Sequence, residues 1–201
     1  MLEIASPLGS RSARRGFTLI ELVVVIAILA IVAALAAPSF IGFLRSSELS
    51  SVANSFIASV NAARSEAMKR NLPAMVMPLD DRHRDWSKGF VAFVDMNRNG
   101  AYDEGDFTVL RQPIDAAYLS FSGNGSAGGT PAYVRYDGSG FARKADGSSN
   151  NLSLTLSRND VSGSANFAQT RRIFILRTGR TRVCTPASAT DTTCQFSGSD
   201  D

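Results

Sequence analysis

The sequence predicts an α+β protein in which one long N-terminal helix, first transmembrane and then amphipathic, packs against a β-rich head. Three features predict this fold: an almost continuously apolar run over residues 17–37, an apolar stripe with helical spacing over residues 49–67, and short apolar or alternating runs between residues 89 and 183. A chain of 201 residues suffices for one such domain with an appended helix, and is too short for two ordinary enzyme domains.

The apolar run from Phe17 to Ala37 has about the length needed to cross a bilayer as a helix. Three arginines precede it, which favours a cytoplasmic location for its N-terminal flank. The length of the run, and Pro38 directly after it, argue against a cleaved signal peptide. Glu21 argues against a simple anchor, because a carboxylate at membrane depth costs about 2.5–3.5 kcal/mol and is kept when it has a partner.

These residues match a known pattern. The stretch "RRGFTLIELVVVIAILAIVAALAAP", residues 14–38, resembles the class III signal of type IV pilins and type II secretion pseudopilins. The resemblance implies that a prepilin peptidase cleaves after Gly16 on the cytoplasmic side and methylates the new N-terminus, Phe17. It also implies that Glu21 faces the amine of the neighbouring subunit in a filament, so that the acid is an assembly contact.

Beyond Pro38, where the first helix of pilins typically bends, the pattern becomes amphipathic. Apolar residues recur at three- and four-residue steps, which predicts one buried helical face. Glu66 and Arg70 form a favourable pair four residues apart, and Asn71-Leu72-Pro73 ends the helix. The predicted buried stripe consists of Leu49, Val52, Phe56, Val60, Ala63 and Ala67.

The rest of the chain predicts β-strands. Apolar or alternating runs occur at Gly89 to Asp95, Thr108 to Ile114 and Ala117 to Gly123. The stretch "PAYVRYDGSGFAR" predicts a hairpin with Asp137-Gly138 at its turn, and "NLSLTLS" alternates so that its leucines share one face. "RRIFILRTGRTRV" is the last and most strand-like run, and residues 157–169 are predicted to be a loop.

Two further stretches narrow the resemblance. "NAARSEAMKRNLP", its spacing to "WSKGFVAFVDMNRNGAYDEGD", and the closing "TGRTR" resemble the FimT/GspH-type minor pilins. That resemblance implies a type IV pilin-like fold with antiparallel β-sheets, and a minor subunit held in the inner membrane by a single span with a periplasmic head. The expected divisions are a leader peptide at 1–16, a transmembrane half-helix at 17–38, an amphipathic half-helix at 39–71, a β-rich head at 72–183, and a disulfide loop with tail at 184–201.

The sequence gives little support for catalysis, and we expect no enzymatic activity. His83 lies in the charged stretch "DDRHRDW", with no sign of the oriented acid and serine that a nucleophilic triad needs. The chain has no Walker loop and no Rossmann glycine pattern. Trp86 is expected at the edge of the core. No cofactor is required by these patterns.

One loop has the spacing of a calcium site. In "DMNRNGAYDEGD", oxygen-bearing side chains and a glycine fall at positions one, three, five, six, nine and twelve, as in an EF-hand loop. Position twelve is aspartate rather than glutamate, and the flanks predict strands rather than helices. A tight Asn-Gly turn between two strands is the simpler interpretation, and the two are compatible. The candidate Ca²⁺ ligands are Asp95, Asn97, Asn99, Asp103 and Asp106.

Cys184 and Cys194 are the two cysteines of the chain. Two thiols without a nearby histidine do not make a zinc site. A pair in a short loop suits a disulfide, and therefore an oxidising compartment such as a periplasm.

The closing segment is strongly basic, with five arginines and no acid between residues 171 and 184. This charge could simply protect an exposed edge strand from aggregation. The resemblance to FimT-type minor pilins implies a second role, because a glycine-arginine-x-arginine motif is associated there with DNA capture during transformation. Here Gly179 would make the turn, and Arg180 and Arg182 would contact phosphates without sequence preference. The wider candidate set adds Arg171, Arg172 and Arg177.

The favoured interpretation is therefore a minor pilin of a type IV pilus-like filament, with DNA among its partners besides other pilins, the prepilin peptidase and the inner membrane. The main alternative is a minor pseudopilin of a type II secretion system, of the H type, with no DNA role. A membrane-anchored, calcium-binding enzyme is a third alternative of a different class. The first needs Arg180 and Arg182 exposed, and the second does not.

Overall fold

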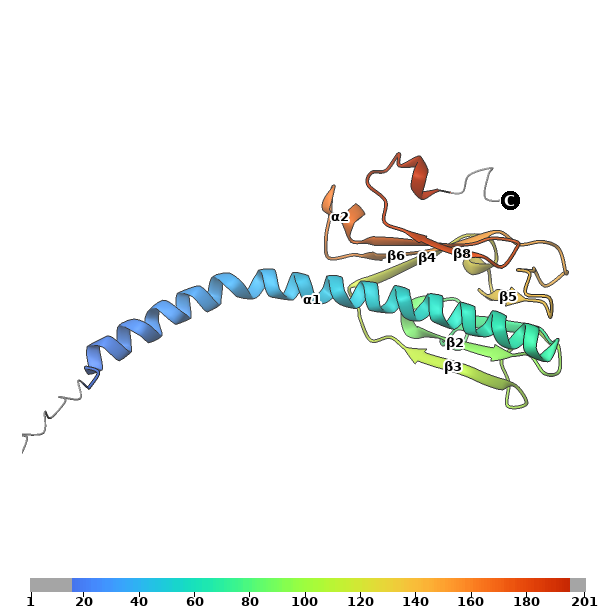
Figure 1. Ribbon diagram of the computed structural model, residues 1–201, viewed down its shortest axis with the longest axis horizontal. Helices are drawn as coiled ribbons and strands as arrows, with labels where there is room; N and C mark the ends of the chain where they lie inside the picture. Colours follow the sequence, from blue (N-terminus) through green and yellow to red (C-terminus); the bar gives the residue numbers. More distant parts are fainter. Residues whose placement is uncertain (1–15, 196–201) are drawn as a thin grey trace, which may run out of the picture. The chain divides into compact units, whose positions relative to one another are not determined.

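The computed structural model describes residues 16–195, without the side chains of residues 37 and 38. The chain forms two compact units, one ending at Leu44 and the other, the head, beginning at Arg45. Helix α1, Leu19–Arg70, belongs to both units and is unbroken at position 38 (Figure 1). In the first unit its apolar side chains are exposed, and an 18-residue window of α1 has a mean hydropathy of 3.1, so it is long and apolar enough to cross a membrane.

The head half of α1 is amphipathic because its apolar residues follow the helical repeat. All six residues of the predicted stripe, from Leu49 to Ala67, are buried. The Nε atom of Arg70 lies 2.7 Å from Glu66 Oε2, which confirms the predicted pair in the last turn. The helix ends where Asn71 adopts a left-handed backbone conformation, with φ of 52°, followed by Pro73 two residues later.

Two four-stranded antiparallel sheets complete the head. Sheet A has the order β3-β2-β1-β5, and sheet B has the order β4-β6-β7-β8. The strands of sheet A are β1 (Ala74–Pro78), β2 (Gly89–Val94), β3 (Phe107–Pro113) and β5 (Val134–Tyr136). Those of sheet B are β4 (Leu119–Gly123), β6 (Leu152–Arg158), β7 (Thr170–Ile175) and β8 (Thr181–Cys184). Short helical turns are α2 (Ala165–Ala168), η1 (Trp86–Lys88), η2 (Gly125–Gly128) and η3 (Thr192–Cys194).

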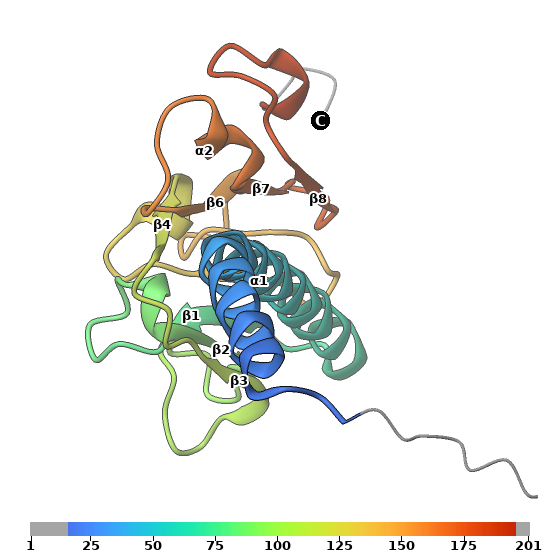
Figure 2. The ribbon, with the colours of Figure 1, turned by 90° about the vertical axis from the view of Figure 1, so that its left-hand side faces the viewer.

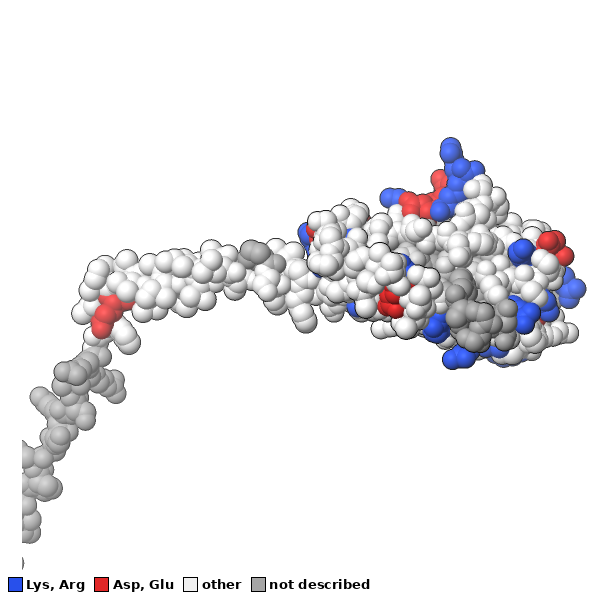
Figure 3. All heavy atoms as spheres, turned by 90° about the horizontal axis from the view of Figure 1, so that it is seen from above, with Lys and Arg blue, Asp and Glu red and all other residues white. Residues whose placement is uncertain are grey.

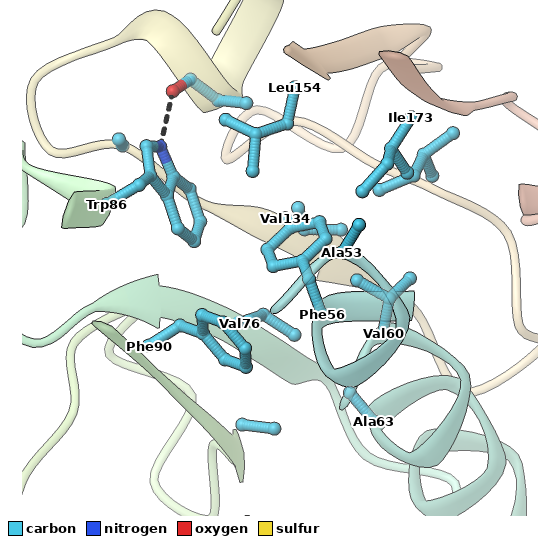
Figure 4. Packing of buried hydrophobic residues seen from close by; sticks show 14 of the residues in the cluster. Ala53, Phe56, Val60, Ala63, Val76, Trp86, Phe90, Val134, Leu154 and Ile173 are labelled. Carbon is cyan, nitrogen blue, oxygen red and sulfur yellow. Dashed lines mark hydrogen bonds between the residues drawn. The ribbon is translucent and has the colours of Figure 1, made fainter. Parts of the chain in front are cut away.

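The main core lies between the head half of α1 and the inner faces of both sheets (Figure 2). Phe56 of α1 makes edge-to-face contacts with Trp86 and Phe90, at ring-centroid distances of 5.4 and 5.2 Å (Figure 4). Trp86 Nε1 donates to the carbonyl oxygen of Ala127 at 2.9 Å, so the indole is buried with its polar atom paired. From sheet B, Leu154 and Ile173 close the same core.

The structure corrects three sequence-based expectations. The buried central strand β1, "AMVMP", was not predicted, because five residues directly after Pro73 are too few to show a period. The closing run "RRIFILRTGRTRV" is a hairpin of β7 and β8 rather than one strand, because Gly179 reverses the chain with φ of 81°. The predicted loop at 157–169 begins with the end of β6 and contains α2.

Candidate functional site

The N-terminus of α1 is closed by a reciprocal pair of hydrogen bonds. The backbone N–H of Thr18 donates to Glu21 Oε2 at 2.9 Å, and the Glu21 N–H donates to Thr18 Oγ1 at 3.2 Å. This is a capping box, in which Thr18 precedes the helix and Glu21 occupies its third position. The spacing Thr-x-x-Glu was visible in the sequence and could have identified Thr18. Phe17, the predicted mature N-terminus, is 88% exposed, whereas the leader residues 1–15 lie outside the described part.

The candidate calcium loop, residues 95–106, is built from turns whose carboxylates accept main-chain N–H groups. Asp95 is buried and accepts from Asn99 and Gly100, and Asp106 accepts from Met96 and Asp103. Gly100 has φ of 75°, as the predicted turn requires.

The third carboxylate of this loop, Asp103, accepts hydrogen bonds from the Asn97 and Asn99 side chains, which hold its pKa below the usual range. Among residues 16–195, no group of three or more His, Cys, Asp or Glu side chains is placed to hold a metal ion. The loop is thus folded by its own hydrogen bonds. Calcium binding there stays a prediction.

The arginines of the closing hairpin separate into two groups. Arg177 and Arg180 flank the β7–β8 turn and are exposed. Within the part of the chain that the structure describes, the Arg180 guanidinium makes no hydrogen bond or ion pair. Figure 3 shows that the end of the head where α1 terminates carries mostly basic side chains.

The other three arginines are half-buried and donate to oxygen atoms of the protein. Arg171 donates to the carbonyl oxygens of Ala168 and Thr170 and to Ser50 Oγ. Arg172 and Arg182 donate to the C-terminal loop, and Arg182 also lies over the ring of Phe174, 4.9 Å from its centroid. The DNA hypothesis requires both Arg180 and Arg182 to be exposed; Arg180 is exposed, whereas Arg182 is half-buried because the chain after β8 folds back over it.

Gly179 has a packing role besides its turn. A side chain there would place a Cβ 2.1 Å from the Gly140 carbonyl oxygen and 2.6 Å from Arg64 Nε. Arg64 of α1 donates to the carbonyl oxygens of Gly140 and Thr178, which fixes the β7–β8 turn against the helix. The glycine of the motif thus allows the close approach that holds the two exposed arginines at a defined place.

Cys184 and Cys194 form a disulfide in the structure, with Cα atoms 5.7 Å apart. Within the loop that it closes, Asp191 accepts hydrogen bonds from the hydroxyl and N–H of Thr193 and the N–H of Ala187. These bonds lower the pKa of Asp191 to about 2, so the loop carries one negative charge at any physiological pH.

The sequence did not predict a charge cluster where α1 enters the head. Asp160 Oδ2 accepts from both Arg158 and Arg45 at 2.7 Å, and Arg45 lies over the ring of Tyr118. Tyr118 donates to Glu48, and burial together with this carboxylate raises the pKa of Tyr118 to about 12. Because Arg158 is only 5% exposed, the cluster fixes the end of β6 to the helix. His83, the one histidine of the chain, has its Nδ1 atom 2.7 Å from the carbonyl oxygen of Pro78.

These features define a class of protein: a membrane-length N-terminal helix with an acid in its first turn, continuing into a head of two antiparallel sheets, as in type IV pilin-like subunits. A family model for the prokaryotic N-terminal methylation motif matches residues 11–37. A family model described as type II transport protein GspH matches residues 52–193, which is more than half of the chain. The chain therefore belongs to the GspH family, and it is a FimT/GspH-type minor pilin or pseudopilin.

Comparison with solved structures gives one match that shares this fold. A crystal structure of the type IV minor pilin FimU from Pseudomonas aeruginosa PAO1 matches with a TM-score of 0.52 and 20% identity, covering 76% of this chain and 99% of FimU. A second crystal form of FimU gives a TM-score of 0.49 and 18% identity, covering 73% and 99%. The first match shows the shared α+β fold. No curated protein sequence gives a significant match.

Proposed function

We propose that the protein is a non-enzymatic minor subunit of a type IV pilus-like filament, held in the inner membrane with its head in the periplasm before assembly. The methylation motif at residues 11–37, continuous with the apolar half of α1, carries this proposal. After cleavage between Gly16 and Phe17, the methylated amine and Glu21 would lie at the start of the same helix. The Glu21 carboxylate would then exchange part of its hydrogen bonding to Thr18 for the amine of a neighbouring subunit.

Cleavage is tested by mass spectrometry of filament-associated protein, which should find an N-methylated Phe17. Gly16→Val should abolish cleavage, because a branched side chain replaces the hydrogen at the position where the peptidase needs a small residue. An intact Met1 in functional filaments would refute the processing step.

The role of Glu21 is tested with three variants that separate charge from helix capping. Glu21→Ala removes both, Glu21→Gln keeps an acceptor for the capping box but loses the charge, and Thr18→Ala weakens the cap but keeps the charge. If Glu21 pairs with an amine, both Glu21 variants should be lost from filaments at equal membrane abundance, and Thr18→Ala should be incorporated. Normal incorporation of Glu21→Gln would reduce the role of Glu21 to capping.

We further propose that the β7–β8 turn binds the phosphate backbone of double-stranded DNA through Arg177 and Arg180. The exposure of both arginines on a turn fixed by Arg64 supports this role. About two phosphate contacts, one for each arginine, place the affinity of one head near the 10⁻⁴–10⁻⁶ M range of non-specific binding, and affinity should fall as salt rises. Several copies in a filament would raise the affinity by avidity.

The DNA role is tested on detergent-solubilised full-length protein by comparing wild type with Arg177→Gln/Arg180→Gln. The double variant should bind more weakly, and its salt slope should be shallower by up to about 1.8, from 0.9 per lost phosphate contact. Arg82→Gln/Arg84→Gln is the matched control, because it removes the same charge from an exposed turn elsewhere on the head. Equal losses in both variants would mean that only net charge matters.

A type II secretion pseudopilin is the second candidate, and the GspH description of the matching family model favours it. In that case the head would contact other pseudopilins or secreted proteins. Absence of DNA binding by the wild-type protein at low salt would select this alternative.

A further inference from the structure

The outer face of sheet B, which the proposed function does not use, carries two arginines around an aromatic ring. The alternating strand β6 turns its leucines toward the core and Ser153 and Thr155 outward. On the neighbouring strand β7, Arg172 and Phe174 lie opposite these two residues. On β8, Arg182 lies opposite Phe174. Arginine beside an aromatic ring is the combination with which proteins hold single-stranded nucleic acid, through phosphate contacts and base stacking.

The C-terminal loop, residues 185–195, covers this surface. Arg172 donates to the carbonyl oxygen of Cys194 at 2.9 Å, and Arg182 donates to those of Thr193 at 3.2 Å and Gln195 at 2.7 Å. Beneath Arg182, Phe174 is only 3% exposed. Figures 1 and 2 both show this segment over β7 and β8. The loop thus accepts hydrogen bonds from both guanidinium groups through main-chain carbonyl oxygens, and it holds Arg182 over the ring.

The cover is attached mainly by polar contacts. Its residues 187–190 and 192–193 are exposed, and only Pro186 and Cys194 are buried. A shallow groove of about 290 Å³ already opens beside it, lined by Asn124, Ser153, Thr155, Arg172, Phe174 and Cys194. Phosphate oxygens carry negative charge and can accept two parallel hydrogen bonds from one guanidinium, whereas the carbonyl oxygens of the loop are neutral single acceptors. A polyanion can therefore compete with the loop for both arginines.

The charge of the loop also disfavours a bound polyanion while the loop is in place. Residues 185–195 contain one acid, Asp191, and no lysine or arginine. The hydrogen bonds of Asp191 shape the loop, and the disulfide from Cys194 to Cys184, the last residue of β8, holds it against the sheet. Arg182 lies two residues beyond Arg180, about 6.8 Å along an extended strand, so an uncovered surface would continue the basic turn.

We propose that the disulfide-closed loop 185–195 is an autoinhibitory lid over a single-strand-binding surface formed by Arg172, Phe174 and Arg182. Its ligand class is single-stranded DNA, with phosphates on the two arginines and a base on the ring. This inference rests on the proposed DNA role of the neighbouring turn, which it extends from duplex to single strands. Opening the lid raises the affinity for single strands more than that for duplex, because only unpaired bases can stack on Phe174.

The test measures binding of a fluorescent oligothymidylate and of a duplex to detergent-solubilised full-length protein. Three forms are compared: the protein with its disulfide intact, the protein after reduction, and the variant Cys184→Ser/Cys194→Ser. In the reduction, dithiothreitol converts the disulfide to two thiols and is itself oxidised to its cyclic disulfide. Opening should raise single-strand affinity about tenfold, from one stacked base, and steepen the salt slope by about 1.4, from two further phosphates at 0.7 each. Adding Arg172→Gln/Arg182→Gln should remove that gain.

A second variant protects the test against unfolding of the reduced protein. Asp191→Ala keeps the disulfide but removes the hydrogen bonds that shape the loop and its one charge, so it should raise single-strand affinity severalfold in folded protein. Unchanged affinity in both Asp191→Ala and folded, reduced protein would overturn the lid. If opening the loop still raises single-strand affinity in Arg177→Gln/Arg180→Gln, the lid is supported. If that variant also binds duplex as tightly as wild type, the proposed site at the turn is refuted, but the lid is not. No binding in any form would overturn both.

Discussion

The two sheets of the head differ in how their faces are covered. Every residue of β1 and β2 is buried, because sheet A is covered by α1 on one face and, on the other, by Leu79, Tyr133 and Tyr102, the last of which belongs to the loop at 95–106. In sheet B, β6 alternates between buried leucines and half-buried serine and threonine. Its outer face is polar, and the C-terminal loop covers it at β7 and β8.

This difference in burial indicates that the two sheets have different roles. A strand buried on both faces can change little without loss of packing, so sheet A serves mainly to hold the fold. The polar residues on the outer face of sheet B and the exposed arginines that flank Gly179 in the β7–β8 turn can vary without disturbing the core. We therefore expect stability to depend most on sheet A and ligand binding to depend most on sheet B.

The largest effect should come from Phe93→Ala on the outer face of sheet A. Phe93 is fully buried, with its ring centroid 5.0 Å from that of Tyr102, and its loss should cost about 3–5 kcal/mol of unfolding free energy. Thr155→Ala, on the outer face of sheet B, is the control and should cost no more than about 0.5 kcal/mol. Urea unfolding followed by the fluorescence of the single, buried Trp86 measures both. Similar losses would remove the contrast between the sheets.

Asp160→Asn should have an intermediate effect, at the place where sheet B is fixed to α1. The hydrogen bond from Arg158, helped by a weaker one from Arg45, holds the pKa of Asp160 far below its usual range, although burial acts in the opposite direction. The variant leaves the buried Arg158 guanidinium without its carboxylate. We expect a cost of about 1–3 kcal/mol, below the roughly 3–5 kcal/mol of fully buried pairs, because the Asp160 side chain is 21% exposed.

The same carboxylate predicts a pH dependence with a definite sign. The folded-state pKa of Asp160 is depressed, so its contribution is fully present above the unfolded value of about 3.9 and is lost as the pH falls further. The difference in unfolding free energy between wild type and Asp160→Asn should therefore be constant from pH 5 to pH 7 and shrink below about pH 4. A difference that does not change with pH would mean that the variant acts through packing.

The sequence predicted those parts of the fold whose signal is local and periodic. The stripe from Leu49 to Ala67 and the alternation of Leu152 to Leu156 follow the periods of helix and strand, and all of these apolar residues are buried as expected. β1 escaped prediction because it is short, and the β7–β8 hairpin because its alternation continues on both sides of the turn. In both cases the local sequence pattern is compatible with more than one secondary structure, and tertiary packing determines which one forms.

The candidate site shows the same limit more clearly. The motif around Gly179 could be read from the sequence, and Arg180 is exposed as the DNA hypothesis requires. The surroundings of Arg182 could not be predicted from the sequence, because its hydrogen-bond acceptors, the carbonyl oxygens of Thr193 and Gln195, belong to a loop whose path depends on the disulfide. Exposure of a charged side chain is a property of the whole fold, whereas the turn is a property of four residues.

The smallest effect should be that of calcium on the loop that covers sheet A. The spacing of Asp95, Asn97, Asn99, Asp103 and Asp106 predicts weak binding, with a dissociation constant on the order of 10⁻⁴–10⁻³ M. At about 2 mM calcium, the weaker limit corresponds to roughly 0.6 kcal/mol of added stability. To bind, an ion must compete with the main-chain N–H groups of the loop that now donate hydrogen bonds to Asp95 and Asp106. This competition favours the weaker limit of the affinity, near 10⁻³ M.

Titration calorimetry and the unfolding midpoint at 0 and about 2 mM calcium measure this effect. Asp103→Asn should abolish it, because the half-buried Asp103 supplies a carboxylate without holding the turn at Asp95. Asp146→Asn, in an exposed turn elsewhere, is the matched control and should respond to calcium as wild type does. Binding should slow amide exchange in sheet A and its loop while leaving sheet B unchanged. No heat at millimolar calcium would leave residues 95–106 as a turn that covers Phe93 and nothing more.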